Sequence, residues 1–178
     1  EWDVPSATGI CQAVEEARPL WVEDPLQVFF SDGYKALRAA SPVPICTGEK
    51  IEGFREFFPF IIEGGIDVLH PDLLWCGGIS GGRKIAELAD HYGVPVALHN
   101  CGTLVHNMAN IHFGACVRNF SMSETRLYER PYIAEMGGLD GYDMVDGKIA
   151  VPDGPGLGVE LVTEVLRAEL KEGEPFWQ

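Results

Sequence analysis

Short β-type runs and helical patterns alternate along most of the chain. Each run is followed by a turn and a helical segment, and the carboxyl ends of successive runs lie 23 to 27 residues apart. One strand, one helix and two loops fit this length, so the pattern predicts parallel strands joined by right-handed crossovers. The predicted strands are residues 20–24, 43–49, 66–72, 94–99 and 119–124.

The predicted helices carry apolar residues on one face. Residues 80–92 have an apolar stripe at i, i+3, i+4 and i+7, with Ser80 as the expected N-cap and Gly93 at the end. The other predicted helices between or before the strands are residues 6–17, 51–62 and 104–115. The first predicted element is therefore a helix with no strand before it.

The last quarter of the chain has a different pattern. Residues 131–158 are rich in Gly, Pro and Asp and predict an irregular segment with a hairpin turning at Asp146–Gly147. A final helix is predicted over about 159–171. We therefore divide the chain into a partial βα barrel, residues 1–130, and an irregular C-terminal segment with a final helix, residues 131–178.

The ends of the strands favour a barrel over an open sheet. All five runs end in an ionisable residue, and a TIM-type barrel gathers such residues at one mouth. An open doubly wound sheet would normally bring a phosphate loop, but the sequence contains neither GxGxxG nor a P-loop. A barrel needs eight units and about 250 residues. We therefore predict an α/β fold, the C-terminal part of a TIM-type (β/α)8 barrel whose first strands are missing from this chain.

Composition narrows the class of protein further. The chain has 178 residues, of which 46% are hydrophobic and 22% charged, as in ordinary globular domains. Its net charge of −14 argues against nucleic acid and anionic membranes as partners. The chain has no apolar run long enough to cross a bilayer and no signal peptide. Five scattered cysteines without C-x-x-C spacing indicate reduced thiols and a cytoplasmic location.

Two acidic strand ends suggest a metal site. Glu23 and Glu49 end adjacent predicted strands, and their carboxylates could share one Mg²⁺, which prefers oxygen ligands and keeps water positions open for substrate. Without a cation, two like charges so close together would repel each other. The simpler alternative is that each glutamate caps its strand in water.

The next three strand ends suggest acid–base chemistry. Asp72 bonded to one imidazole nitrogen of His99 would fix the tautomer and raise the basicity of the other nitrogen, which makes His99 a candidate general base. Glu124 is a candidate proton donor to a developing oxyanion. His70 points to the same side of its strand as Asp72 and could touch substrate, and Arg126 could bind a substrate carboxylate. The alternative for His70 is a place in a filled interior layer of the barrel, and surface ion pairing is the default for Arg126. Helix capping or solvation is the default for Lys50, and a structural role is the default for His106 and His112.

The ordered motifs resemble the enolase superfamily. WVEDP (21–25), CTGEK (46–50), HPDLLWCGGIS (70–80) and ALHNCG (97–102), with the tail DGPGLGVE (153–160), are similar to the mandelate racemase subgroup, which includes acid-sugar dehydratases. The resemblance covers essentially the whole chain. It implies a (β/α)7β barrel, a separate N-terminal capping domain, one Mg²⁺ and abstraction of the proton α to a carboxylate.

The resemblance also implies roles for individual residues. Glu23 and Glu49 match the second and third metal ligands, and Asp72 and His99 match the Asp–His dyad. Glu124 matches a glutamate that hydrogen-bonds the substrate carboxylate. Three expected parts fall outside this chain: the first metal ligand, the second-strand catalytic group and the capping domain. We expect residues 131–178 to pack on that capping domain. Homo-oligomers are expected because the family commonly forms them.

These observations predict a Mg²⁺-dependent dehydratase that removes water from a small-molecule sugar acid through an enediolate. A racemase or epimerase would use the same dyad with a second base on the missing second strand, so it remains an alternative. A non-catalytic fragment or scaffold that keeps the barrel without the metal is another.

Overall fold

A computed structural model describes residues 1–125, 135–137 and 144–176 of the protein. Five parallel strands lie in sequence order in one sheet, confirming the predicted α/β fold. They are β1 (Val22–Glu23), β2 (Ile45–Thr47), β3 (Val68–Leu69), β4 (Val96–Leu98) and β5 (Phe120–Ser123). Each strand is shorter than its predicted run. Most of the ionisable residues therefore lie in loops just beyond the strands, where the barrel mouth is expected.

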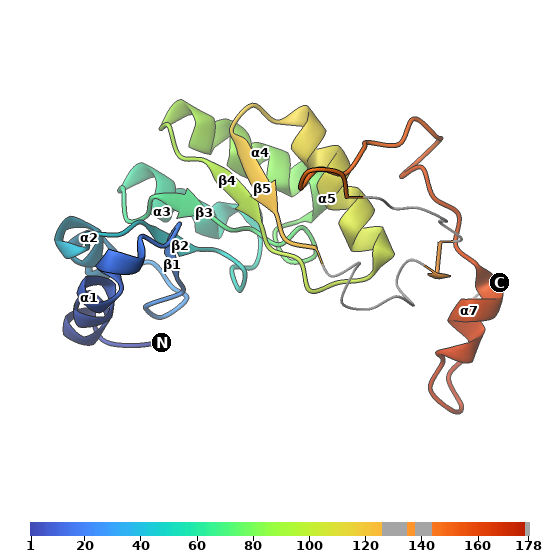
Figure 1. Ribbon diagram of the computed structural model, residues 1–178, viewed down its shortest axis with the longest axis horizontal. Helices are drawn as coiled ribbons and strands as arrows, with labels where there is room; N and C mark the ends of the chain where they lie inside the picture. Colours follow the sequence, from blue (N-terminus) through green and yellow to red (C-terminus); the bar gives the residue numbers. More distant parts are fainter. Residues whose placement is uncertain (126–134, 138–143, 177–178) are drawn as a thin grey trace.

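Helices lie between successive strands, as right-handed crossover connections require, and further helices lie before the first strand and after the last. They are α1 (Val4–Ala13), α2 (Asp32–Ala40), α3 (Phe58–Ile62), α4 (Gly78–His91), α5 (Leu104–Cys116) and α7 (Thr163–Ala168), with 3₁₀ turns η1 (Glu15–Ala17) and η2 (Phe54–Phe57). Figure 1 shows α4 and α5 beside the strands and the C-terminal segment with α7 extending away from them. Among the described residues, no helix combines the length and apolar character needed to cross a membrane.

Several helix boundaries differ from the predictions. Ser80 is not the N-cap of α4: the helix begins at Gly78, and Gly77, with φ of 99°, occupies the cap position because glycine adopts this conformation readily. The predicted helix 51–62 is a 3₁₀ turn followed by the short helix α3, with Pro59 in the first turn, where proline costs little. The predicted helix 159–171 is reduced to α7.

Helix α2 was missed by the sequence analysis. Its only fully buried side chains are Tyr34 and Leu37, so its apolar stripe is too narrow to stand out among charged neighbours. The hairpin prediction is confirmed: Val145 and Lys148 form an antiparallel bridge, with positive φ at Asp146 and Gly147. The division into two regions at residue 130 stays a prediction.

The core fills the space between the sheet and its helices. Tyr34, Phe57 and Phe60 are fully or almost fully buried, and the rings of Tyr34 and Phe60 meet edge to face with centroids 4.9 Å apart. This packing holds the strands in register. It thereby fixes the loops at their carboxyl ends, where the candidate functional residues lie.

Candidate functional site

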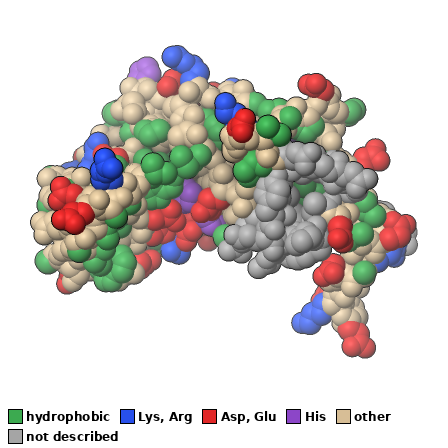
Figure 2. Space-filling model, in the orientation of Figure 1, with side chains coloured by type: hydrophobic (Ala, Val, Ile, Leu, Met, Phe, Trp, Pro, Cys, Tyr) green, Lys and Arg blue, Asp and Glu red, His purple; other side chains and the backbone are tan. Residues whose placement is uncertain are grey.

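Five of the residues singled out at the strand ends come together at one edge of the sheet. Figure 2 shows acidic and histidine side chains meeting near the middle of the molecular face. Parallel pairing brings this about because every strand ends at the same edge. Glu23 ends β1, Glu49 follows β2, and Asp72, His99 and Glu124 follow β3, β4 and β5 in turn.

Asp72 and His99 form a close hydrogen-bonded pair. The imidazole Nδ1 of His99 donates to Asp72 Oδ2 over 2.8 Å. The other carboxylate oxygen of Asp72 accepts from the Leu74 amide over 2.7 Å and lies 3.3 Å from His106 Nε2. Asp72 is buried, so these contacts hold its carboxylate in one orientation. The second nitrogen of His99 is left to face the strand ends.

Three further groups approach His99 Nε2. Glu49 Oε2 lies 3.1 Å away and Glu124 Oε2 lies 3.8 Å away. The thiol of Cys101 is 3.2 Å from the same nitrogen. A proton on this nitrogen is therefore surrounded by acceptors, one of which, Glu124, is 48% exposed.

The contacts of this pair shift its pKa values in opposite directions. The hydrogen bond to Asp72 raises the pKa of His99 against the effect of burial, and the charges of Glu49 and Glu124 add to the rise. Burial alone would raise the pKa of Asp72, but the hydrogen bonds from His99 and the Leu74 amide leave it lowered. The arrangement therefore favours an ionised aspartate beside a strongly basic imidazole.

Glu49 is positioned by its neighbours in the chain. Gly48 has φ of 147°, and a Cβ there would lie 2.8 Å from the backbone of His70, so a glycine is needed for β2 to approach β3 at this point. Lys50 Nζ bonds Glu49 Oε1 over 3.0 Å and Asp24 Oδ2 over 2.9 Å. Lys50 thus balances two carboxylates at the site, a role that the sequence analysis missed.

His70 lies deeper than His99. It is 1% exposed, and its Nδ1 donates to the Ala97 carbonyl over 3.0 Å. Its Nε2 lies 3.6 Å from Glu23 Oε2 and 3.8 Å from Glu124 Oε2. The structure thus places His70 beside two of the predicted site residues. The remaining candidate, Arg126, lies outside the described residues.

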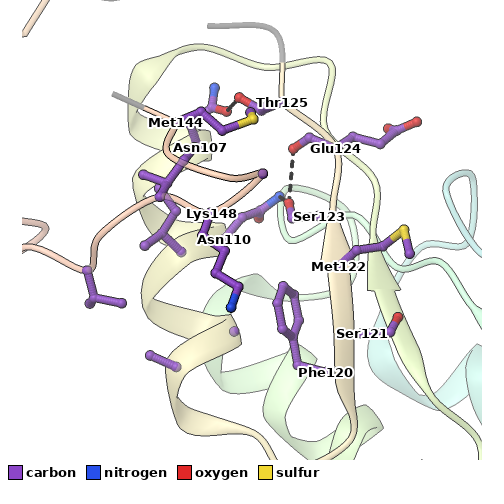
Figure 3. A pocket seen from close by; sticks show the side chains of 16 residues that line it. Asn107, Asn110, Phe120, Ser121, Met122, Ser123, Glu124, Thr125, Met144 and Lys148 are labelled. Carbon is purple, nitrogen blue, oxygen red and sulfur yellow. Dashed lines mark hydrogen bonds between the residues drawn. The ribbon is translucent and has the colours of Figure 1, made fainter. Parts of the chain in front are cut away.

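Glu124 is held by the loop after β4. Its Oε2 accepts from the Asn100 amide over 2.9 Å. The residue also borders a pocket of about 480 Å³ that lies along β5 and α5 and is closed by residues 144–151. Figure 3 shows the Glu124 carboxylate directed away from Lys148 and Asn110 in that pocket. The Glu124 carboxylate therefore lies with His70 and His99 and not in this pocket.

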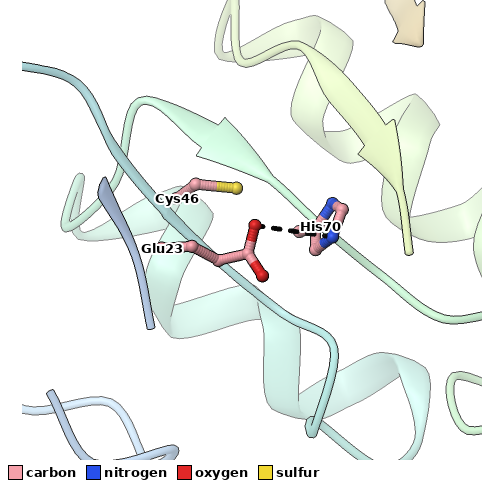
Figure 4. Close-up of side chains that lie close together, drawn as sticks. All are labelled: Glu23, Cys46 and His70. Atoms are coloured by element: carbon pink, nitrogen blue, oxygen red, sulfur yellow. Dashed lines mark ion pairs between the residues drawn. The ribbon is translucent and has the colours of Figure 1, made fainter. Parts of the chain in front are cut away.

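Two kinds of donor set are available for a cation. Glu23 and Glu49 supply only carboxylate oxygens, which fit Mg²⁺ chemically. A second set consists of Glu23, Cys46 and His70, whose ligand atoms all lie within 4.8 Å of one another (Figure 4). The sequence did not single out Cys46 as a candidate ligand. Its position could have indicated this role, because it lies three residues before Glu49 and on the strand next to Glu23.

Comparisons with known proteins place the fold and the motifs in a family. The family described as enolase C-terminal domain-like matches residues 1–165. A D-xylonate dehydratase of Haloferax volcanii is 31% identical over 175 residues, covering 97% of this chain and 42% of that protein. A D-gluconate dehydratase of Thermoproteus tenax is also 31% identical, over 97% of this chain and 36% of its own length.

Solved structures agree with these sequence matches. A mandelate racemase/muconate lactonizing enzyme from Sulfitobacter sp. superposes with a TM-score of 0.88 at 30% identity, over 97% of this chain and 43% of that one. A protein with the same description from Jannaschia sp. CCS1 has a TM-score of 0.86 at 32% identity and similar coverage. The chain spans about two fifths of the length of these relatives, consistent with part of a barrel. The chain is a member of the enolase C-terminal domain-like family within the enolase superfamily.

Proposed function

We propose that the protein carrying this chain is a Mg²⁺-dependent dehydratase acting on a sugar acid. The observation that carries the proposal is the 2.8 Å hydrogen bond between His99 Nδ1 and Asp72, with the opposite imidazole nitrogen facing the acidic strand ends. The relatives named as D-xylonate and D-gluconate dehydratases support the substrate class.

His99 acts as the general base in this proposal. Its Nε2 takes the proton from the carbon next to the substrate carboxylate, and Asp72 stabilises the imidazolium that forms. The electron pair of that C–H bond moves toward the carboxylate and then returns to form a C2–C3 double bond. The 3-hydroxyl leaves with the proton that His99 carries, as water. The remaining enol tautomerises to a 2-keto-3-deoxy acid, so protons and electrons balance.

Glu23 and Glu49 would hold the Mg²⁺. When bound, the cation supplies positive charge that stabilises the negative charge developing on the substrate carboxylate. Lys50 keeps Glu49 in place through its 3.0 Å ion pair. Three other residues complete the substrate contacts. Glu124 is the proton donor and, in its protonated form, hydrogen-bonds the substrate carboxylate. His70 lines the floor of the site, and Arg126 binds the same carboxylate.

The proposal is tested by incubating the purified protein with Mg²⁺ and a panel of sugar acids that includes D-xylonate, D-gluconate and D-galactonate. We expect 2-keto-3-deoxy product from one or a few of them. His99→Asn should abolish the product while leaving the fold intact by circular dichroism. His91→Asn, at the exposed last residue of α4, is the matched control and should keep full activity.

The same assay run in deuterated water separates dehydration from racemisation. A racemase or epimerase would exchange the α-hydrogen of a substrate and invert that centre without forming a keto acid. Neither product nor exchange with any acid of the panel, in protein that binds Mg²⁺, would contradict the proposed dehydratase.

A further inference from the structure

Three side chains from three adjacent strands point toward one small volume inside the sheet. Glu23 on β1 pairs in register with Cys46 on β2, and His70 directly follows β3. The carboxylate oxygen, the thiol sulfur and the imidazole nitrogen lie within 4.8 Å of one another. Figure 4 shows the three side chains close together. Cations bound by three protein ligands have such spacings, because ligand atoms about 2.0–2.3 Å from one ion are less than 5 Å apart.

His70 is prepared for binding a cation by its other nitrogen. Its Nδ1–H donates to the Ala97 carbonyl, which leaves the lone pair of Nε2 directed toward Glu23. The imidazole is 1% exposed, and Nε2 has no hydrogen-bond partner among the described residues. An unsatisfied buried nitrogen is costly. Metal-binding histidines commonly have this arrangement, with the second nitrogen donating to a backbone carbonyl.

The other two ligands are also held in place. Trp21 Nε1 donates to Glu23 Oε2 over 2.9 Å, which orients the carboxylate. Cys46 is fully buried on β2 and pairs in register with Glu23 on β1, so strand pairing fixes the thiol beside the carboxylate. The sulfur would bind a cation as thiolate, because a metal deprotonates a coordinating thiol.

We propose that Glu23, Cys46 and His70 bind Zn²⁺. One sulfur, one nitrogen and one oxygen donor with a fourth position for water are typical of zinc, whereas Mg²⁺ prefers oxygen ligands alone. This site differs from the Glu23 and Glu49 pair in its thiolate and its imidazole, and it lies deeper in the sheet. Because Glu23 belongs to both, Zn²⁺ here would displace Mg²⁺ and inhibit the dehydratase, a consequence that rests on the proposed function.

Co²⁺ is the probe because it binds zinc sites and reports a bound thiolate by sulfur-to-metal charge-transfer absorption. The purified protein is freed of metal with a chelator and titrated with Co²⁺. We expect a charge-transfer band that saturates at one equivalent and disappears when Zn²⁺ is added. Cys46→Ser should lose the band, and His70→Gln should weaken Co²⁺ binding about tenfold or more, the lower range for changes around a metal site.

Two variants locate the site. Cys101→Ser removes the exposed thiol beside His99 and should keep the band. Glu49→Gln removes one proposed Mg²⁺ ligand and should also keep it, since Glu49 is not part of this set. The absence of any band, or its loss in Cys101→Ser or Glu49→Gln, would overturn the proposal. The Co²⁺ absorption band is measured without substrate turnover. Its presence or absence therefore tests the zinc site independently of the dehydratase activity.

Discussion

At the scale of single residues, Asp72 is the centre of the hydrogen-bond network beneath the site. One oxygen accepts from His99 and the other from the Leu74 amide, with His106 also in contact. Such a carboxylate can contribute to catalysis without touching the substrate. It sets the tautomer and the basicity of the imidazole, and the imidazole is the group that contacts the substrate.

Replacement of Asp72 by Asn is therefore expected to lower kcat for the sugar acid by roughly 10²–10⁴-fold, the usual range for general acid–base catalysis. KM should change little. The amide cannot stabilise imidazolium, so the pKa of His99 falls, and the limb of the kcat/KM profile that reports this base moves to lower pH. Steady-state kinetics across pH measures both effects.

Asp90→Asn is the control for this substitution. Asp90 pairs with Arg118 at the surface over 3.8 Å, and its loss should leave kcat and the pH profile unchanged. An Asp72→Asn variant with normal kcat would show that the hydrogen bond to His99 has no part in the reaction.

At the scale of elements, close packing at the start of α4 sets the loop that carries Asp72. Gly81 lies on the first turns of this helix, and a Cβ built there would be 2.1 Å from the carbonyl oxygen of Cys76. The glycine lets the chain after β3 fold back tightly onto the helix. Gly9 in α1 is also helical, but a Cβ there meets nothing within 4 Å.

The two glycines should therefore respond oppositely to alanine. Gly81→Ala is expected to destabilise the protein by at least about 1–3 kcal/mol, as overpacking does. Gly9→Ala should stabilise it by about 0.5–1 kcal/mol, because alanine is the better helix former. Urea unfolding of the two variants and the parent measures both. Equal effects of the same sign would contradict the packing at Gly81.

At the scale of the whole molecule, acidic groups outnumber basic ones by 27 to 13, and several of them meet at one edge of the sheet. Lys50 offsets part of this charge through its ion pairs with Glu49 and Asp24. A divalent cation at Glu23 and Glu49 would offset more. Folding and cation binding are then linked, because the unfolded chain does not bring the two carboxylates together.

Mg²⁺ is accordingly expected to raise the melting temperature of the metal-free protein. At 100 times its dissociation constant a ligand stabilises by about 2.7 kcal/mol. Thermal unfolding with and without MgCl₂ measures the shift, and NaCl at the same ionic strength is the control for general screening. Glu49→Gln should lose the specific part of the shift. An equal shift in this variant would place the bound Mg²⁺ elsewhere.

Much of the architecture could be predicted from local patterns. Alternating runs and helical stripes indicated five parallel strands in order, and the motifs around Glu23, Glu49, Asp72 and His99 indicated the superfamily. These features depend on residues near each other in the chain, so periodicity and spacing report them. The sequence did not predict helix α2, with its narrow apolar stripe, or the start of α4 at a glycine cap. Both features are stabilised by packing against segments distant in the chain.

Only the tertiary structure brought together groups that the sequence separates. The distances from His99 to Asp72 and Glu49, the pairing of Lys50 with Asp24, and the convergence of Cys46 with His70 depend on strand register and on the paths of loops. Register is a property of paired strands, set by the packing of side chains far apart in sequence. Local sequence therefore establishes which chemical groups lie at the strand ends, whereas strand register and loop paths establish which of them are in contact.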